Sequence, residues 1–419
     1  MMPARSIGLD LSRNPRPRDR RLRLALRMAK MIRVGTLTLV LPDRSTHRIA
    51  ASPEPAAMIV LHDARAIARL MTRGSLGLAE AYVEGWWDSP DILQVMALAS
   101  ANEAEWDEFL RGQPLIRAMQ RVLHRLRPNS RRGAARNIIA HYDLGNDFYA
   151  SWLDPTMTYS AALFAAPEGS GAKESLHAAQ LRKMRRIAET LDLRPGMRVL
   201  EIGCGWGGFA ELAAGEYGAE VLGITLSPAQ LAYGQARIAA AGLAEKVMLR
   251  CQDYRDVSGH FDAIVSVEMI EAVGETYWPT YFATLRERLR PGGKAMIQAI
   301  TIADRLFADY RHTADFIQRH IFPGGMLASP ARLREEVARA GLAWREAHWF
   351  GPDYARTLAR WQAAFQDAWP RIAGMTQPGQ AKAYDTRFKR LWEYYLAYCE
   401  AGFRAGWTDV GQIVLAKGN

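Results

Sequence analysis

The chain has 419 residues, 49% hydrophobic and 23% charged, and carries a formal net charge of +10. This composition is that of a globular protein with a sizeable core and excludes an intrinsically disordered chain. The three scattered cysteines cannot form a disulfide framework, which favours a reducing, cytoplasmic setting. No Cys/His spacing typical of a metal site is present, and no run of about eighteen apolar residues predicts a membrane span.

The positive charge is concentrated in two segments. Residues 1–33 hold ten Lys and Arg against two Asp, a net charge of +8. Residues 117–136 hold seven Arg and no acidic residue, a net charge of +7. The remainder of the chain is therefore mildly acidic, at about −5.

The first basic segment, an N-terminal arm, has the spacing of an amphipathic helix. One side of the helical wheel is cationic, with Arg20, Arg23, Arg27 and Lys30. The other side is apolar, with Leu22, Ala25, Ala29 and Ile32. A helix lying on anionic lipid and a solvated basic tail both remain open as interpretations. We predict no nucleic-acid binding, because no aromatic-interleaved basic motif or zinc module is present.

Residues 34–110 predict a small N-terminal α+β domain. A run rich in leucine and β-branched residues, 35–41, predicts a strand, and a second apolar run covers 58–61. Helical stretches follow between residues 64 and 82. Residues 111–136, with a Pro-Asn-Ser turn and the arginine run, predict a basic linker.

From about residue 137 helical stretches alternate with buried strand-like runs. This alternation is typical of a parallel sheet flanked by helices, and hence of an α/β fold. The predicted strands cover residues 198–202, 221–224, 247–250, 261–267, 294–300 and 413–415. Between Trp349 and Trp407 the pattern is helical.

A glycine-rich loop follows the first of these strands and opens a helix. Gly203, Gly205 and Gly207 let backbone N–H groups and the helix N-terminus approach a ligand closely. A dinucleotide site would need an acidic residue that closes the next strand. That strand ends instead at Thr225, with Gln230 one turn into the following helix. Hydroxyl and amide groups suit the ribose or the amino-acid tail of S-adenosylmethionine, which needs no phosphate clamp.

Four motifs together resemble the cyclopropane fatty acid synthase family. They are the runs His141–Tyr149, Leu153–Ser160, Leu200–Gly207 and Gly223–Gln230. The resemblance covers residues 137–419 and implies a class I methyltransferase fold: Rossmann-like, with a mostly parallel seven-stranded sheet and a helical C-terminal insertion. The N-terminal domain is similar to the extra domain of the longer bacterial members.

The resemblance implies S-adenosylmethionine as the cofactor and assigns residues to it. The expected cofactor-binding residues are Tyr159, Ser160, Glu201, Gly203, Gly205, Gly207, Thr225, Gln230, Gln252 and Asp253. Within this set, the Glu201 carboxylate lies at a strand end, where it can pair with a cationic amino group. Asp253 follows a predicted strand, and a plain surface acid stays open as its alternative.

The resemblance also implies the catalytic residues Glu271, Tyr354 and Cys399, the last as the weakest of the three. Glu268 lies three residues before Glu271, and for Glu268 a function and a helix-terminal acid are equally supported. Cyclopropane synthases hold a bicarbonate base with a Cys and two His. This chain has Ala161, Ala272 and Gln298 at those positions, which puts bicarbonate and ring closure in doubt.

The implied reaction is methyl transfer to the cis double bond of unsaturated acyl chains of membrane phospholipids, through a carbocation. Loss of a proton from the new methyl group gives a cyclopropane, and other fates of the cation give a methylene- or methyl-branched chain. A small-molecule methyltransferase and a non-catalytic lipid-binding protein are the competing interpretations. The expected partners are anionic phospholipids, at the inner membrane face, and the resemblance allows a homodimer.

Overall fold

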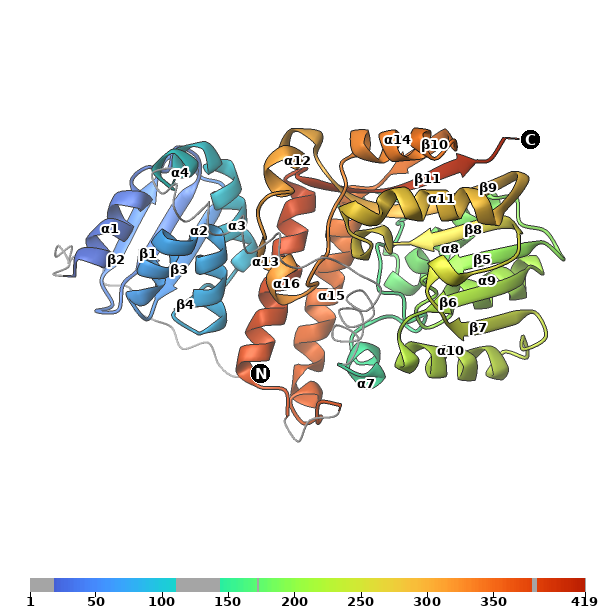
Figure 1. The fold of residues 1–419 in the computed structure, drawn as a ribbon. Coiled ribbons are helices and arrows are strands. Elements are labelled where there is room, and N and C mark those ends of the chain that lie inside the picture. The colour runs from blue at the N-terminus through green and yellow to red at the C-terminus, as the bar shows by residue number, and fades with distance from the viewer. Residues whose placement is uncertain (1–18, 111–143, 172, 379–382, 419) are drawn as a thin grey trace. The chain divides into compact units, whose positions relative to one another are not determined.

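The computed structural model describes residues 19–110, 144–171, 173–378 and 383–418. The chain divides into two compact units, an N-terminal unit that also includes Asp385–Ala401 and a larger unit made of the remaining residues from 121 onward (Figure 1). The predicted linker at 111–136 and the motif residues 141–143 lie outside the described residues.

The N-terminal unit contains a four-stranded sheet with the order β2-β1-β3-β4. These strands are β1 (Thr36–Val40), β2 (Thr46–Ala50), β3 (Ala56–Leu61) and β4 (Trp87–Asp88). The helices before the linker are α1 (Arg20–Ala29), α2 (Arg65–Val83), α3 (Ile92–Ala101) and α4 (Glu103–Leu110). Helix α2 joins the two predicted helical stretches across a kink at Gly74, where φ is 61°. The predicted strands at 35–41 and 58–61 are confirmed as β1 and β3.

Helix α1 uses its apolar side inside the N-terminal unit. Leu22, Ala25, Met28 and Ala29 are buried, and α1 packs against α2. The cationic side chains of the opposite face are exposed: Arg20, Arg23, Arg27 and Lys30. An apolar face that is covered by protein cannot enter lipid, and a packed helix is not a solvated tail. Both interpretations of residues 20–29 were therefore wrong in part, and an exposed cationic face remains.

The C-terminal helix α16 (Thr386–Arg404) contributes most of its length to the N-terminal unit. Arg390 on this helix donates hydrogen bonds of 2.6 Å to the Tyr82 carbonyl and 2.7 Å to the Trp87 carbonyl. Its guanidinium carbon also lies 4.0 Å from the centroid of the Tyr82 ring. The methyltransferase domain expected from the resemblance covers residues 137–419 without a break, whereas the structure groups residues 385–401 with the N-terminal unit.

The larger unit contains a seven-stranded sheet with the order β10-β11-β9-β8-β5-β6-β7. The strands are β5 (Arg198–Ile202), β6 (Glu220–Thr225), β7 (Val247–Cys251), β8 (Phe261–Val267), β9 (Leu289–Ile302), β10 (Ala343–Trp349) and β11 (Thr408–Ala416). Strands β5 to β9 pair in parallel, and β11 pairs antiparallel with both β9 and β10. The predicted α/β class with a mostly parallel seven-stranded sheet is confirmed.

Helices cover both faces of this sheet (Figure 1). The larger unit contains α7 (Asn146–Ala150), α8 (Leu176–Thr190), α9 (Gly208–Tyr217), α10 (Pro228–Ala240), α11 (Trp278–Arg288), α12 (Asp304–Tyr310), α13 (Phe316–His320), α14 (Pro330–Arg339) and α15 (Gly351–Ile372). A hydrophobic core lies on each face of the sheet. On one face the strand side chains pack against α8, α9 and α10, and on the other face they pack against α11 and α14. Strands buried on both faces explain the continuous apolar runs in the sequence.

The sheet places the functional positions at one edge. Because β5, β6, β7, β8 and β9 run in parallel, their carboxyl ends meet along the same edge, where ligands of open α/β sheets bind. Within the described residues, no helix combines the length and apolar character needed to cross a bilayer.

Candidate active site

The glycine-rich loop connects β5 to α9. Gly203, Gly205 and Gly207 have φ values of 84°, 52° and 83°, a region that favours glycine. The backbone N–H groups of Gly203 and Cys204 both donate to the Ile224 carbonyl at 2.9 Å, which fixes the loop to β6. A Cβ on Gly203 would lie only 3.1 Å from Met269 Cγ. The loop is therefore lined by backbone and lies against the residues that follow β8.

Glu201, the last but one residue of β5, has a carboxylate that needs a partner. The residue is 4% exposed, and its Oε2 is buried with no hydrogen-bond donor among the described residues. Burial raises the pKa of Glu201 to about 8, against the opposing effect of the Lys183 charge. A cationic amino group at this position would satisfy the orphaned oxygen. The loop and Glu201 thus fit the amino-acid tail of S-adenosylmethionine.

Strands β6 and β7 end in hydroxyl, amide and carboxylate groups. Thr225 Oγ1 donates to Gln230 Oε1 at 2.8 Å, and both side chains are buried. The Gln252 backbone N–H donates to the Thr225 carbonyl at 3.0 Å, which brings the two strand ends together. Asp253 accepts from Arg255 at both oxygens, at 2.8 and 2.6 Å. Any further ligand of Asp253 must share this carboxylate with Arg255.

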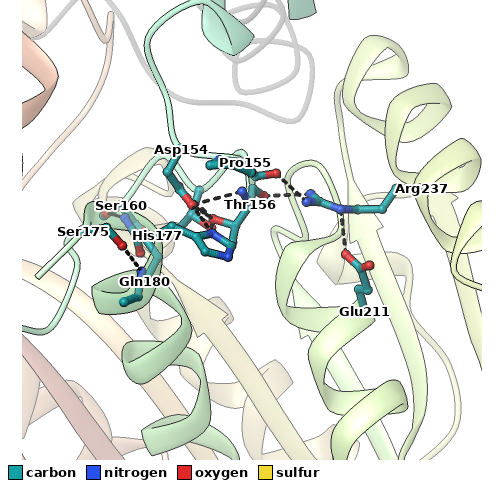
Figure 2. Close-up of polar contacts among 11 residues, drawn as sticks. Asp154, Pro155, Thr156, Ser160, Ser175, His177, Gln180, Glu211 and Arg237 are labelled. Carbon is teal, nitrogen blue, oxygen red and sulfur yellow. Dashed lines mark hydrogen bonds and ion pairs between the residues drawn. The ribbon is translucent and has the colours of Figure 1, made fainter. Parts of the chain in front are cut away.

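The chain segment that leads to Tyr159 and Ser160 is fixed at its start (Figure 2). Buried Asp154 accepts from the Thr156 backbone N–H at 3.0 Å and contacts His177 Nδ1 at 3.1 Å. Arg237 on α10 donates to the Thr156 carbonyl at 2.7 Å and to the Pro155 carbonyl at 2.8 Å. The Arg237 Nε also pairs with Glu211 of α9 at 2.7 Å. Arg237 therefore clamps this segment onto α9 and α10.

Two buried polar side chains of α8 hold Ser160. Gln180 Nε2 donates to the Ser160 carbonyl at 2.8 Å, and Lys183 Nζ donates to Ser160 Oγ at 2.7 Å. Burial lowers the pKa of Lys183 to about 8, although the charges of Glu268, Asp154 and Glu201 act in the opposite direction. Sequence reasoning missed this ammonium group.

The signal that identifies Lys183 is its position rather than its type. It lies on the buried side of α8 with Ala179, Met184 and Ile187, while Arg182 and Arg185 are exposed. A lysine on the apolar stripe of an amphipathic helix requires buried partners, because an unpaired charge there is strongly unfavourable.

Glu268 directly follows β8, and its carboxylate accepts three hydrogen bonds. Oε1 accepts from the Ala161 backbone N–H at 2.9 Å and from Gln298 Nε2 at 2.8 Å. Oε2 accepts from the Tyr354 hydroxyl at 2.7 Å. Burial raises the pKa of Glu268, and the hydrogen bonds from Tyr354 and Ala161 act against it.

The Glu268 backbone is strained. Its φ is 48°, in the left-handed region that glycine adopts freely and glutamate does not. Such a conformation costs on the order of 1 kcal/mol and persists where the surroundings enforce it, most often at functional sites. The three donors around the carboxylate, and the bond of 2.7 Å from the Glu268 N–H to the Gln298 carbonyl, supply that enforcement.

Glu271 provides a second carboxylate beside Glu268. Its Oε1 accepts from the Ile300 backbone N–H at 2.6 Å, and its Oε2 is buried without a donor among the described residues. Burial, followed by the charge of Glu268, raises the pKa of Glu271 to about 8. Glu271 accepts one hydrogen bond and Glu268 accepts three, so Glu271 is the residue that retains its proton near neutrality.

Of the other expected catalytic residues, Tyr354 belongs to this group, and the role of Cys399 stays a prediction. Tyr354 lies on α15, is 6% exposed, and its ring centroid is 4.5 Å from that of Phe403. Cys399 lies on the part of α16 that groups with the N-terminal unit.

The site does not fit a bicarbonate base. Ala161 and Ala272 offer only methyl groups as side chains at two of the expected positions. The donors that remain, the Ala161 N–H, Gln298 Nε2 and the Tyr354 hydroxyl, all bind the Glu268 carboxylate. Gln298 is held in this orientation because its Oε1 accepts from Gln412 Nε2 at 3.1 Å. The Glu268 carboxylate therefore already binds the hydrogen-bond donors at Ala161 and Gln298, two of the three positions that depart from the family pattern.

The sheet order, the glycine loop and the unpaired Glu201 oxygen define a class I methyltransferase that uses S-adenosylmethionine. The chain belongs to the mycolic acid cyclopropane synthetase family, which matches residues 129–413. The predicted resemblance, fold and cofactor are thereby confirmed.

Two relatives match over most of their length. Tuberculostearic acid methyltransferase UfaA1 of Mycobacterium tuberculosis is 40% identical over 396 residues, covering 91% of this chain and 88% of the relative. The cyclopropane-fatty-acyl-phospholipid synthase of Escherichia coli strain K12 is 36% identical, covering 84% of this chain and 85% of the relative. The crystal structure of mycolic acid cyclopropane synthase CmaA1 with SAH and CTAB has a TM-score of 0.61 at 29% identity and covers 68% of this chain and 98% of that one.

The Arg237 clamp has a measurable consequence. Replacing Arg237→Ala removes two hydrogen bonds to this segment, one to the Trp206 carbonyl and an ion pair with Glu211. We therefore expect local opening of the segment 154–161 to become more favourable by about 2 kcal/mol, roughly thirtyfold. Hydrogen–deuterium exchange of that peptide measures the effect. Exposed Arg250→Ala, on the far strand β7, is the control and should leave the peptide unchanged. Equal exchange in both variants would show that the clamp contributes nothing.

Proposed function

We propose that this enzyme transfers a methyl group from S-adenosylmethionine to the cis double bond of unsaturated acyl chains of membrane phospholipids. The observation that carries the proposal is the pair of neighbouring carboxyl groups, Glu268 and Glu271, beside the glycine loop. An alkene that accepts a methyl cation becomes a carbocation, which needs nearby negative charge and a base. The names of the Mycobacterium and Escherichia coli relatives support an acyl substrate.

The cofactor, when bound, supplies an electrophilic methyl group on a sulfonium. We assign Glu201 to its amino group, the loop of Gly203, Gly205 and Gly207 to its methionine portion, and Thr225 to Gln230 to its ribose. Gln252 and Asp253 at the end of β7 are assigned to its adenine. Tyr159 and Ser160 approach from the segment that Arg237 and Lys183 hold.

The carbocation is assigned to the space next to Tyr354, Glu268 and Glu271. Tyrosine and phenylalanine faces attract cations, and Tyr354 packs on Phe403. A methylene- or methyl-branched product is the second candidate, because the donors of the bicarbonate position bind Glu268 instead. In either case the acyl chain receives the methyl group.

Incubating the protein with a trideuteromethyl cofactor and vesicles of a cis-unsaturated phospholipid tests the proposal. Mass spectrometry should show labelled methyl groups in the unsaturated lipid and none in its saturated counterpart. Proton NMR then distinguishes a cyclopropane from a branched chain.

Glu201→Gln is the companion variant. We expect it to weaken S-adenosylmethionine binding at least tenfold in calorimetry, because a neutral amide cannot pair with the amino group. Exposed Glu245→Gln is the matched control and should bind as the wild type does. Unlabelled lipid in the wild-type reaction would exclude the proposed function, and normal cofactor binding by Glu201→Gln would exclude the assigned role.

We further propose that the exposed cations of α1 bind anionic lipid. Arg20, Arg23, Arg27 and Lys30 lie on one exposed helix face, and the first turn of α1 has no acidic residue. Each Lys or Arg near an anionic bilayer contributes about 1 kcal/mol, and the effect is screened by salt. Because the apolar side of α1 is buried, binding through this face is electrostatic.

Replacing Arg20, Arg23 and Arg27 with Gln should therefore weaken binding to anionic vesicles by about 3 kcal/mol at low salt, roughly a hundredfold. Vesicle co-sedimentation measures the effect, with neutral vesicles as the reference. The matched control neutralises three exposed arginines of the larger unit, Arg250, Arg286 and Arg345. Equal weakening in the two triple variants would point to net charge alone and contradict a specific role for α1.

A further inference from the structure

We propose that the carboxylate of Glu268 is the base that removes the proton from the carbocation, in the place that bicarbonate takes in cyclopropane synthases. This inference deepens the proposed function and rests on it. The first support is position: Glu268 follows β8 directly, next to Met269, which contacts the glycine loop. The residue as a whole is half-buried, and its carboxylate is enclosed by the Ala161 N–H, the Gln298 amide and the Tyr354 hydroxyl at the carboxyl end of β8.

The second support is the way in which the carboxylate is held. An ionised carboxylate can accept about four hydrogen bonds. Oε1 of Glu268 accepts two, from Ala161 and Gln298, and Oε2 accepts one, from Tyr354. One acceptor position on Oε2 remains for a proton. Three hydrogen bonds hold the base in one orientation, so it loses little conformational entropy when it reacts. A weak base suffices, because a C–H bond next to a carbocation is strongly acidic.

The third support is the contrast with Glu271. Glu271 accepts one backbone hydrogen bond and has no donor at Oε2 among the described residues, so it is the carboxyl that keeps a proton near neutrality. The other titratable groups that face Glu268 are Tyr354 on α15 and Lys183 on α8. Lys183 carries positive charge toward Glu268 and favours its ionised form. Glu268 is therefore the group that can accept a proton.

The electrons and atoms balance as follows. The π electrons of the double bond form a bond to the methyl carbon, the carbon–sulfur bond breaks with its electrons on sulfur, and a cation remains on the acyl chain. A C–H bond of the new methyl group, or of the neighbouring chain carbon, then gives its electrons to a ring or a double bond. Its proton passes to Glu268 Oε2, and the resulting carboxylic acid releases it to solvent after the product leaves.

Removal and replacement of the carboxylate tests the proposal. In the Glu268→Gly variant, glycine adopts the φ of 48° without strain, and the missing side chain leaves a space the size of one carboxylate. In carbonate-free buffer we expect lipid methylation to fall at least a hundredfold, within the range for loss of a general base. Added formate or bicarbonate should restore activity at least tenfold and saturably. Nitrate, a planar anion of similar size that is not basic, should not restore it.

Two variants complete the test. Glu268→Gln fills the space without a base, so it should be as inactive as Glu268→Gly and gain nothing from formate. Asp192→Gly is the matched control, because Asp192 is an exposed residue outside the site with a φ of 55°; it should keep wild-type activity with or without formate. Calorimetry with S-adenosylmethionine should show that Glu268→Gly still binds the cofactor.

The contrary results are equally definite. Near-normal activity of Glu268→Gln, or a Glu268→Gly enzyme that binds cofactor but responds equally to formate and nitrate, would overturn Glu268 as the base while leaving the proposed function intact. Loss of cofactor binding in Glu268→Gly would make the residue structural and overturn the inference as well. A wild-type protein that methylates no lipid would overturn the proposed function and this inference together.

Discussion

The hydrogen bonds to the Glu268 carboxylate connect the separate parts of the site. Ala161 belongs to the segment before α8, Gln298 to β9 and Tyr354 to α15, and all three donate to this one side chain. Burying a carboxylate is unfavourable unless donors compensate it, so these elements must assemble around it correctly. The strained backbone of Glu268 is the local consequence.

The charges around Glu268 depend on one another. Lys183 is enclosed near Glu268, Asp154 and Glu201, and its ammonium group favours the ionised form of both glutamates. Glu201 and Glu271 each have one buried carboxylate oxygen that finds no hydrogen-bond donor in the described part of the chain. These orphaned oxygens suit a ligand that brings its own positive charge, since opposite charges in a poorly solvated site attract strongly. The polar groups thus suit a cationic cofactor and a cationic intermediate on the acyl chain.

Much of the fold could be predicted because the sheet is buried on both faces. Strands β5 and β8 were predicted to the residue and β6 and β7 to within one residue at each end, whereas β9 begins five residues before its predicted start. Strand β10 was not, since Arg345, Glu346 and His348 interrupt its apolar pattern at the edge of the sheet. Glu268 could not be distinguished from a helix-terminal acid by sequence, because its donors come from positions 107, 30 and 86 residues away. Such distant contacts, like the packing of α16 with the N-terminal unit, leave no local pattern.

Wild-type lipid methylation, measured in buffer freed of carbonate and then with bicarbonate titrated back, shows whether the base is part of the chain. If Glu268 accepts the proton, the rate is the same at every bicarbonate concentration. A rate that collapses without carbonate and rises saturably on its return would show that the base is a bound anion and that Glu268 does not accept the proton.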